Sequence, residues 1–283
     1  MNLLSTTKLS KSLDIRLIVL DIDGTIAGES NSVREPVRQA LSQAQQQGIA
    51  VTLATGRMFH SARRFYQAIS GTFPLIAYNG AWIQDPLSSE RHQHLPIPPA
   101  IAAQLLDALE HPDWRQQIQI HCYIDDHLYV REITAETESY IQRSGCQVTP
   151  VGDLRSLLAQ PTTKVLAMGA DSQLMTQLLA TLQQRFAATE LHLTQSTTTF
   201  FEATHPQANK GEAVRYLAEQ LLGLKPENVL AIGDNFNDRE MLEYAGIGIA
   251  MGDAPDEIKA IADWVAPGVE VDGVVAALER FIL

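Results

Sequence analysis

The chain contains very little cysteine. Cys122 and Cys146 are its only two cysteines among 283 residues, and neither stands in a CxxC pair. Two separate thiols are too few for a thiolate zinc site, and a disulfide framework of the kind used by secreted domains is not expected. The sequence therefore favours a reducing compartment, and we expect a cytoplasmic protein.

Long apolar runs and an excess of cations are also missing. No window approaches about 18 consecutive apolar residues, which is the length that a membrane-spanning helix needs. The first 14 residues, MNLLSTTKLSKSLD, lack the apolar stretch of a signal peptide and predict a loose tail. With 21 Lys and Arg against 33 Asp and Glu, the formal net charge is -12. Since nucleic acids and anionic membranes bind clustered cations, we expect neither as a partner.

What the sequence does contain is an alternation of strand and helix patterns. The apolar run LIVL (17–20) predicts a buried strand, and a helix is expected to follow from an N-cap at Ser32. A second strand is expected over 49–57, a helix over 59–69 and a third strand over 74–80. This βαβαβ order is typical of a doubly wound parallel sheet.

The same alternation returns near the C-terminus, after a long intervening segment. The later elements are expected at 209–223 (helix), 229–233 and 246–251 (strands), 255–262 (helix), 264–266 (strand) and from about Val274 (helix). The intervening segment is too long for a structureless loop. It contains a predicted hairpin (117–132), a strand (162–170) and helices near 98–111, 134–143 and 171–187.

These patterns predict an α/β protein of two domains. We expect a doubly wound, Rossmann-like parallel-sheet core from residues 1–86 and 197–283, and an inserted α+β domain from residues 87–196. The connectors are expected at Asp85–Ser89 and Gln195–Thr199.

Polar, glycine-containing sequences follow four of the predicted core strands. The first strand ends in DIDGT (21–25), the second in TGR (55–57), the third in NG (79–80) and a late one in GDNFND (233–238). In an open parallel sheet, ligands bind beyond the carboxyl ends of the strands. These four segments are therefore expected to line one site.

Several carboxylates at one site require a cation. At about 4 Å and an effective dielectric constant of about 20, each pair of like charges costs about 4 kcal/mol. Carboxylate and carbonyl oxygens with open water positions suit Mg²⁺. Asn209 and Glu212 form a capping-box pattern that places Lys210 in the first turn of a helix, where a cation opposes the helix dipole unless an anion is bound. The sequence therefore predicts Mg²⁺ together with a phosphate group.

Phosphoryl transfer through a covalent aspartyl intermediate fits this set of residues. Asp21 would attack phosphorus, and Asp23 would act as general acid and then as general base, provided that the backbone turns sharply at Gly24. The Thr55 hydroxyl and the Gly56 amide would hold phosphate oxygens, and Asp234 would complete the metal site.

The motifs DIDGT, ATGR, NKG and GDNFND, in this order, resemble those of the haloacid dehalogenase superfamily of phosphatases. The long insertion between the second and third motifs resembles that of the Cof-type branch, which has a large α/β cap. Three further segments carry the same resemblance: NGA (79–81), AGIGIAMGDA (245–254) and ADWVA...DGV (262–274). The resemblance implies a nucleophile (Asp21), an acid/base that also ligates metal through its carbonyl (Asp23), Mg²⁺ ligation (Asp21, Asp234), phosphate contacts (Thr55, Gly56, Lys210, Asn237) and supporting residues (Asp238, Asn79).

Some alternatives remain open at this point. Arg57 could reach the phosphate or hold its loop through an ion pair. The expected substrate is a small phosphorylated metabolite, a sugar phosphate first and pyridoxal phosphate or flavin mononucleotide next. A sugar phosphomutase would share the four motifs, and a noncatalytic protein that binds phosphorylated metabolites is the other class. The chain could be a monomer or a small homo-oligomer.

Overall fold

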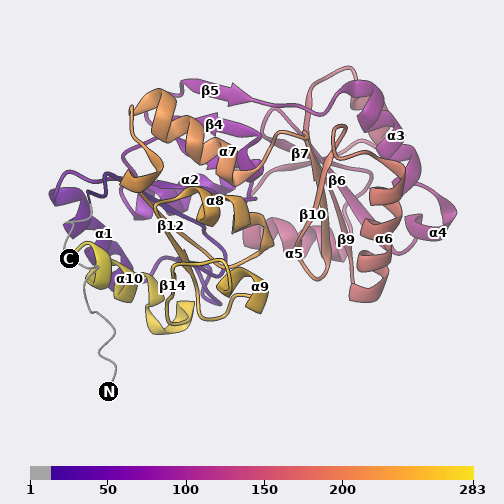
Figure 1. Cartoon of the computed structure of the whole chain (residues 1–283). Coiled ribbons are helices and arrows are strands. Elements are labelled where there is room, and N and C mark those ends of the chain that lie inside the picture. Colours follow the sequence, from indigo (N-terminus) through magenta and orange to yellow (C-terminus); the bar gives the residue numbers. More distant parts are fainter. Residues whose placement is uncertain (1–13) are drawn as a thin grey trace.

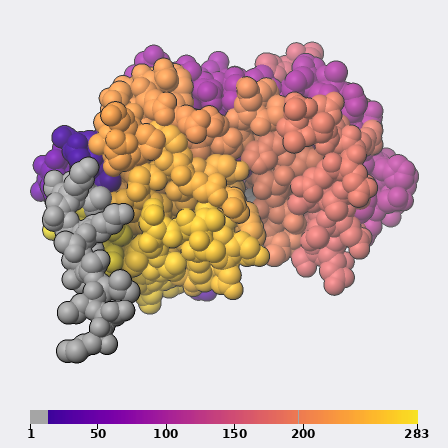
Figure 2. All heavy atoms as spheres, viewed as in Figure 1, coloured from indigo at the N-terminus to yellow at the C-terminus, as the bar shows by residue number. Residues whose placement is uncertain are grey.

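Two domains lie side by side in the computed structural model, which describes residues 14–283 (Figures 1 and 2). Nearly all of the expected N-terminal tail, residues 1–13, lies outside the described residues. Among the described helices, none is long and apolar enough to cross a membrane.

The core is a five-stranded parallel sheet in the order β14-β13-β12-β1-β2. Its strands are β1 (Leu17–Leu20), β2 (Ala50–Leu53), β12 (Val229–Gly233), β13 (Ile247–Ala250) and β14 (Trp264–Val265). The four residues of β1 are buried on both faces, since every one of them meets a helix layer. The expected doubly wound α/β fold is therefore confirmed.

Helices cover both faces of this sheet. Ile18 and Leu20 pack with α1 (Glu35–Gln46) and α10 (Gly273–Phe281), whereas Leu17 and Val19 pack with α7 (Lys210–Arg215) and α8 (Arg239–Tyr244). The remaining core helices are α2 (Phe59–Ala68), α9 (Asp256–Lys259) and the π-helical turn η3 (Tyr216–Leu221), which continues α7. Alternate residues of one strand thus build two separate apolar layers.

Helix α1 begins later than expected. Its N-cap is Arg34, which makes no side-chain capping bond, and Pro36 lies in the first turn. The expected N-cap, Ser32, instead contacts the Ser30 hydroxyl. Proline favours this start because its fixed φ suits the first helical turn and its missing N–H is not needed there.

The third expected strand joins the core sheet through a single parallel bridge. Ile76 of β3 (Leu75–Ala77) forms a parallel bridge with Ala54, next to β2. Beyond that bridge β3 pairs antiparallel with β4 (Trp82–Gln84), and β4 pairs with β5 (Arg91–His94). The expected connector Asp85–Ser89 is therefore the turn between β4 and β5.

The inserted domain is built on a six-stranded sheet in the order β10-β11-β9-β6-β7-β8. Its strands are β6 (Ile118–Ile124), β7 (His127–Val130), β8 (Val148–Pro150), β9 (Thr162–Gly169), β10 (His192–Thr197) and β11 (Phe200–Thr204), and its helices are α3 (Pro99–Leu109), α4 (Pro112–Arg115), α5 (Ala135–Ser144) and α6 (Ser172–Arg185). The hairpin predicted over 117–132 corresponds to β6 and β7.

The expected second connector, Gln195–Thr199, lies within the β10–β11 hairpin, and β11 pairs with β9. With the expected boundaries at 87 and 196, β11 would belong to the core and β5 to the insertion. However, β11 pairs with β9 of the inserted sheet, and β5 pairs with β4 beside the core. We propose instead that the inserted domain spans residues 95–204, between the end of β5 and the end of β11.

The two faces of the inserted sheet have different partners. Helices α3 and α6 cover the face that carries Ile120, Cys122 and Val165. The opposite face, with Lys164, Leu166 and Met168 of β9, lines a cleft shared with the core. The inserted domain thus presents one sheet face to the carboxyl ends of the core strands.

Candidate active site

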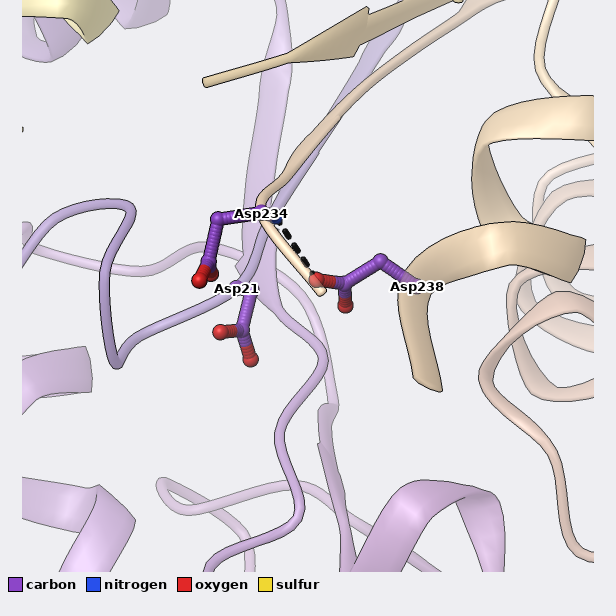
Figure 3. A group of neighbouring side chains, drawn as sticks. All are labelled: Asp21, Asp234 and Asp238. Atoms are coloured by element: carbon purple, nitrogen blue, oxygen red, sulfur yellow. Dashed lines mark hydrogen bonds between the residues drawn. The ribbon is translucent and has the colours of Figure 1, made fainter. Parts of the chain in front are cut away.

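Carboxylates from two neighbouring parallel strands meet beyond the sheet. Asp21 directly follows β1 and Asp234 directly follows β12, and the two strands are paired. One carboxylate oxygen from each of Asp21, Asp234 and Asp238 lies within 4.8 Å of the others (Figure 3). The strand ends therefore converge as the sequence predicted.

A sharp turn at Gly24 carries the chain away from Asp21. Gly24 has a φ of 82°, and a Cβ at this position would lie 2.3 Å from Asp234 Oδ2. Only glycine fits this left-handed turn against a carboxylate. The next residue, Thr25, donates its hydroxyl to Asp234 Oδ1 at 3.2 Å, so the turn also orients the second carboxylate.

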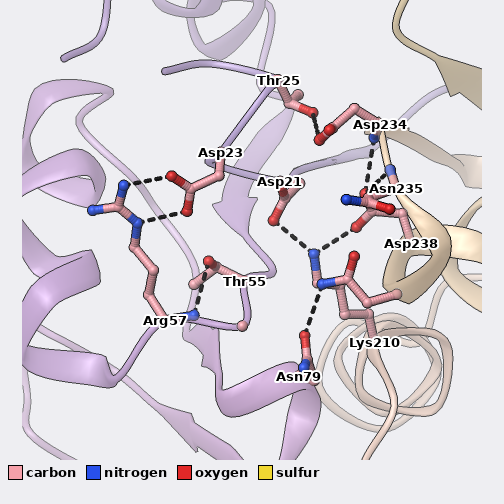
Figure 4. A network of polar contacts seen from close by, with 12 residues as sticks. Asp21, Asp23, Thr25, Thr55, Arg57, Asn79, Lys210, Asp234, Asn235 and Asp238 are labelled. Atoms are coloured by element: carbon pink, nitrogen blue, oxygen red, sulfur yellow. Dashed lines mark hydrogen bonds and ion pairs between the residues drawn. The ribbon is translucent and has the colours of Figure 1, made fainter. Parts of the chain in front are cut away.

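Lys210 enters the same site from the first turn of α7. Its ammonium donates to Asp21 Oδ1 at 2.6 Å and to Asp238 Oδ1 at 2.5 Å, and its side chain is fully buried (Figure 4). The expected N-cap is present, because Asn209 Oδ1 accepts from the Glu212 N–H at 2.7 Å. The cation thus lies at the helix N-terminus, between carboxylates.

Asp238 supports the other groups. Its Oδ1 faces Lys210, and its Oδ2 accepts the backbone N–H groups of Asp234 at 2.8 Å and of Asn235 at 3.0 Å. The carboxylate therefore shapes the loop that presents Asp234 and also positions the lysine. Asp238 was expected to support either the metal or Lys210, and the structure contains the contact with Lys210.

The local electrostatics favour a bound cation. Burial raises the pKa of Asp21, with repulsion from Asp238 and Asp23 adding to the effect and Lys210 opposing it. Burial and the charges of Asp21 and Asp238 likewise raise the pKa of Asp234. A single lysine does not neutralise three carboxylates. Asp21 and Asp234 therefore offer a hard, all-oxygen donor set of the kind that divalent metals such as Mg²⁺ prefer.

The loop after β2 carries Thr55, Gly56 and Arg57. Thr55 Oγ1 accepts the Arg57 N–H at 3.2 Å. The Arg57 guanidinium donates to both carboxylate oxygens of Asp23, at 2.7 and 2.6 Å (Figure 4). Of the two alternatives for Arg57, the structure thus contains the ion pair. Although burial opposes the charged form, these hydrogen bonds and the arginine charge lower the pKa of Asp23.

Asn79 and Asn237 lie against each other on the other side of this loop. Asn79 is buried with a left-handed backbone (φ 54°), and its Oδ1 accepts from Asn237 Nδ2 at 3.0 Å. Asn237 lines the cleft together with Asp21, Thr55 and Gly56. All nine residues expected at the site are therefore brought to one region.

Two buried charges of the inserted domain were not predicted. Lys164 of β9 and Glu202 of β11 form an ion pair at 3.2 Å, with side chains 2% and 4% exposed. A signal was present in the sequence, since each is the only charged residue of a strand whose other members are apolar or hydroxylated. Such a residue on a core-facing strand usually has a buried partner.

The comparisons with known proteins agree with the geometry. The family model described as haloacid dehalogenase-like hydrolase matches residues 18–278. The pyridoxal phosphate phosphatase YbhA of Escherichia coli is 30% identical over 257 residues, covering 88% of this chain and 92% of its own. The 5-amino-6-(5-phospho-D-ribitylamino)uracil phosphatase YitU of Bacillus subtilis is 29% identical, covering 94% and 97%.

A solved structure gives the same result for the fold. A haloacid dehalogenase-like hydrolase from B. subtilis superimposes with a TM-score of 0.83 at 26% identity, covering 95% of this chain and 100% of that one. The fold and the convergent site thus define a hydrolase of the α/β class with an inserted domain. The chain belongs to the haloacid dehalogenase-like hydrolase family and is a phosphatase-type enzyme, so the family and enzyme class predicted from the motifs are confirmed.

Proposed function

We propose that this protein is a Mg²⁺-dependent phosphomonoesterase that hydrolyses small phosphorylated metabolites through an aspartyl-phosphate intermediate. The observation that carries the proposal is the meeting of Asp21, Lys210 and Asp234 from segments about two hundred residues apart, with oxygen and ammonium atoms at hydrogen-bond or ligand distances. Carboxylates buried beside a lysine suit the binding of a metal and a phosphate dianion together.

Asp21 is proposed as the nucleophile. Lys210 holds Oδ1 of Asp21 at 2.6 Å and so fixes the rotation of the carboxylate. A carboxylate oxygen of Asp21 attacks phosphorus, the bond from phosphorus to the ester oxygen breaks, and the leaving alkoxide takes a proton from Asp23. Because the Arg57 contact favours the charged carboxylate, Asp23 must take up this proton when the substrate binds. Water then attacks the acyl phosphate and gives its proton to Asp23, which releases inorganic phosphate and restores Asp21.

Mg²⁺ bound by the carboxylates of Asp21 and Asp234, with the Asp23 carbonyl, would neutralise charge on the transferring phosphoryl group. Thr55, Gly56 and Asn237 lie in the same cleft and would hold the phosphate oxygens. Lys210 would contribute the positive charge nearest to the nucleophile.

The leaving group would lie against the inserted domain. The shared cleft has a volume of about 790 Å³. In the inserted sheet, Met168 lies between Gln119 on β6 and Phe200 on β11, and these three residues form a row that lines the cleft. Leu166 lies next to Met168 on the same face of β9, between Met168 and Lys164. A sugar hydroxyl pressed against Leu166 or Met168 would lack a partner, at a cost of about 1–3 kcal/mol.

A flat heteroaromatic leaving group fits this row better than a sugar does. One of its faces would pack on Met168 and Phe200, while its polar edge would bond the amides of Gln117 and Gln119. The row therefore supports heteroaromatic phosphates such as pyridoxal phosphate as substrates beside the sugar phosphates expected first, whose hydroxyls could bond Ser139, Thr197 or Thr199 elsewhere in the cleft. Among the relatives, one is named for pyridoxal phosphate and another for a phosphoribitylamino uracil.

The test is release of free phosphate from a panel of phosphate monoesters in the presence of Mg²⁺. We expect hydrolysis by the wild type and a loss of at least about 1000-fold in Asp21→Asn, because the nucleophile is removed while the carboxylate shape is kept. If Asp21→Asn keeps more than about a tenth of the wild-type rate, the nucleophile is misassigned. If a hexose phosphate is isomerised without free phosphate, the protein is a mutase. Binding without turnover would indicate the noncatalytic class.

A further inference from the structure

A chain of buried polar contacts joins the inserted domain to two loops of the core site. Lys164 Nζ donates to the carbonyl oxygen of Gly56 at 2.8 Å and pairs with Glu202 Oε1 at 3.2 Å. Glu202 Oε2 accepts from Asn79 Nδ2 at 3.0 Å, and Asn79 Oδ1 accepts from Asn237 Nδ2 at 3.0 Å. The contacts therefore run from the phosphate loop, through the inserted domain, to the loop that carries Asp234.

The contact with Gly56 controls the orientation of one peptide group. The Gly56 carbonyl and the Arg57 N–H belong to the same planar trans peptide, so they point in opposite directions. With the carbonyl directed at Lys164, the Arg57 N–H is directed at Thr55 Oγ1, where it donates at 3.2 Å. Lys164 thereby sets the position of the hydroxyl proposed to bind the phosphate.

The backbone at Asn79 needs such external support. Tyr78 and Asn79 are consecutive non-glycine residues with positive φ, 52° and 54°. Each left-handed residue of this kind costs about 1 kcal/mol or more and persists where the surroundings fix it. Glu202 and Asn237 hold the Asn79 side chain from both ends, and the Tyr78 ring lies 5.7 Å from Lys164 Nζ.

Stability alone does not account for the ion pair. Lys164 and Glu202 are almost fully buried, and a hydrophobic pair of similar volume often stabilises a fold equally well, because burying charge is costly. What an apolar pair lacks is a donor for the Gly56 carbonyl and an acceptor for the Asn79 amide. Both of those contacts cross from the inserted domain to the core.

We propose that Lys164 and Glu202 are positioning residues that assemble the phosphate site when the inserted domain is seated on the core. Lys164 orients the Gly56–Arg57 peptide, and Glu202 fixes Asn79 and, through it, Asn237. The site is complete only with both domains in contact, although neither charge touches the reacting atoms. This proposal rests on the function proposed above, and it explains how contacts between the two domains would contribute to the affinity of the site for phosphate.

The experiment compares four variants of the full chain: Lys164→Met with Glu202→Gln as a neutral pair, Lys164→Met alone, Lys164→Arg, and the exchange Lys164→Glu with Glu202→Lys. Three quantities are measured: the melting temperature, kcat and KM with a phosphate ester, and the affinity for inorganic phosphate with Mg²⁺. Phosphate affinity is read by calorimetry and does not depend on turnover.

The neutral pair is expected to melt near the wild-type temperature, while kcat/KM falls by about 100-fold, because a misplaced site loses about that factor. The affinity for inorganic phosphate is expected to fall by about tenfold, because Lys164 no longer holds the loop that carries Thr55 and Gly56. Lys164→Arg keeps a donor for Gly56 and is expected to recover part of the activity.

The exchanged pair separates positioning from stability. It restores opposite charges but places a carboxylate against the Gly56 carbonyl, so its melting temperature should exceed that of Lys164→Met while its activity stays low. The proposal is overturned if the exchanged pair recovers activity together with stability, or if the neutral pair keeps both kcat/KM and phosphate affinity within about threefold of wild type. Should the exchanged pair not fold, the neutral pair alone decides. A wild type without phosphatase activity would instead contradict the proposed function.

Discussion

The Asp23 carboxylate and the Arg57 guanidinium form a two-point contact, with Nε donating at 2.7 Å and Nη2 at 2.6 Å. The Asp23 side chain is 47% exposed, whereas that of Arg57 is 12% exposed. Arg57 is itself packed over the Phe65 ring at 4.5 Å. A well-packed arginine therefore fixes a half-exposed carboxylate that would otherwise sample several rotamers.

Replacing Arg57 separates its two possible roles. If Arg57 positions Asp23, Arg57→Met should lower kcat by about 10- to 100-fold, because the acid/base group loses its orientation, and leave inorganic phosphate affinity unchanged. Arg57→Lys keeps the charge but cannot form the two-point contact, so its loss should be smaller. A fall in phosphate affinity with unchanged kcat would instead place Arg57 on the phosphate. Steady-state kinetics and calorimetry give both values.

Metal binding should be visible in stability as well as in activity. Chelation is expected to abolish phosphate release, and Mg²⁺ at about 100 times its Kd should stabilise the wild type by about 2.7 kcal/mol. Asp234→Asn is expected to lose this response, because one of the converging carboxylates is neutralised. Thermal unfolding with and without Mg²⁺ measures the effect.

The metal-free proteins provide the control for this prediction. Without metal, burial and then repulsion from Asp21 and Asp238 raise the pKa of Asp234, so Asp234→Asn should be at least as stable as the wild type. A large loss of stability in the metal-free variant would show that Asp234 serves the fold through its contact with Thr25 rather than the metal.

Asp126, in the turn between β6 and β7, joins the inserted domain to the core at a second point. Its Oδ1 accepts the Tyr78 hydroxyl at 2.8 Å, and its Oδ2 accepts the His60 N–H at 2.8 Å, in the first turn of α2. Helix α2 has no side-chain cap of its own, so Asp126 provides one from the other domain.

Removing this cap should cost stability. Asp126→Ala is expected to lower the free energy of unfolding by about 1–2 kcal/mol, as for other helix caps. Asp126→Asn keeps an oxygen acceptor and should lose less, which makes it the matched control. Denaturant unfolding of the two variants tests the difference, and equal stabilities would mean that the contact does not hold the domains together.

The sequence predicted the parallel core and the converging site because both depend on local patterns. Apolar runs followed by glycine and aspartate mark the strand ends, and pairing of parallel strands brings Asp21 and Asp234 together whatever the inserted domain does. The position of Lys210 in the first turn of α7 could also be predicted, because the N-cap Asn209 is a local signal three residues from its partner Glu212.

Contacts between segments that are distant in the sequence could not be predicted from local patterns. The expected boundary at residue 196 falls inside the β10–β11 hairpin, which pairs with the inserted sheet through β9, and nothing local in the sequence distinguishes such a hairpin from a connector. The contact of Lys164 with Gly56 depends on how the two domains dock, and the contact of Arg57 with Asp23 depends on how two loops of the core approach each other. A lone charge in an apolar strand indicates that a buried partner exists, but it does not say which residue supplies it.

His121 gives a prediction on acid stability. It is fully buried on β6, its Nε2 lies 3.4 Å from Thr137 Oγ1, and its Nδ1 has no partner among the described residues. Burial, with a smaller contribution from the Lys164 charge, lowers its pKa from 6.5 to about 3. The folded protein therefore keeps this ring neutral at pH values where the unfolded chain protonates it.

Stability from this residue is complete above pH 6.5 and is lost as the pH falls toward 3, because the unfolded state then binds the extra proton. At pH 4.5 the loss amounts to about 2–3 kcal/mol, from about 1.4 kcal/mol per pH unit. In His121→Gln this contribution is absent, so the decline between pH 7 and 4.5 should be shallower than in the wild type by that amount. Denaturant unfolding at several pH values measures both slopes, and parallel slopes would mean that His121 is already protonated in the folded protein.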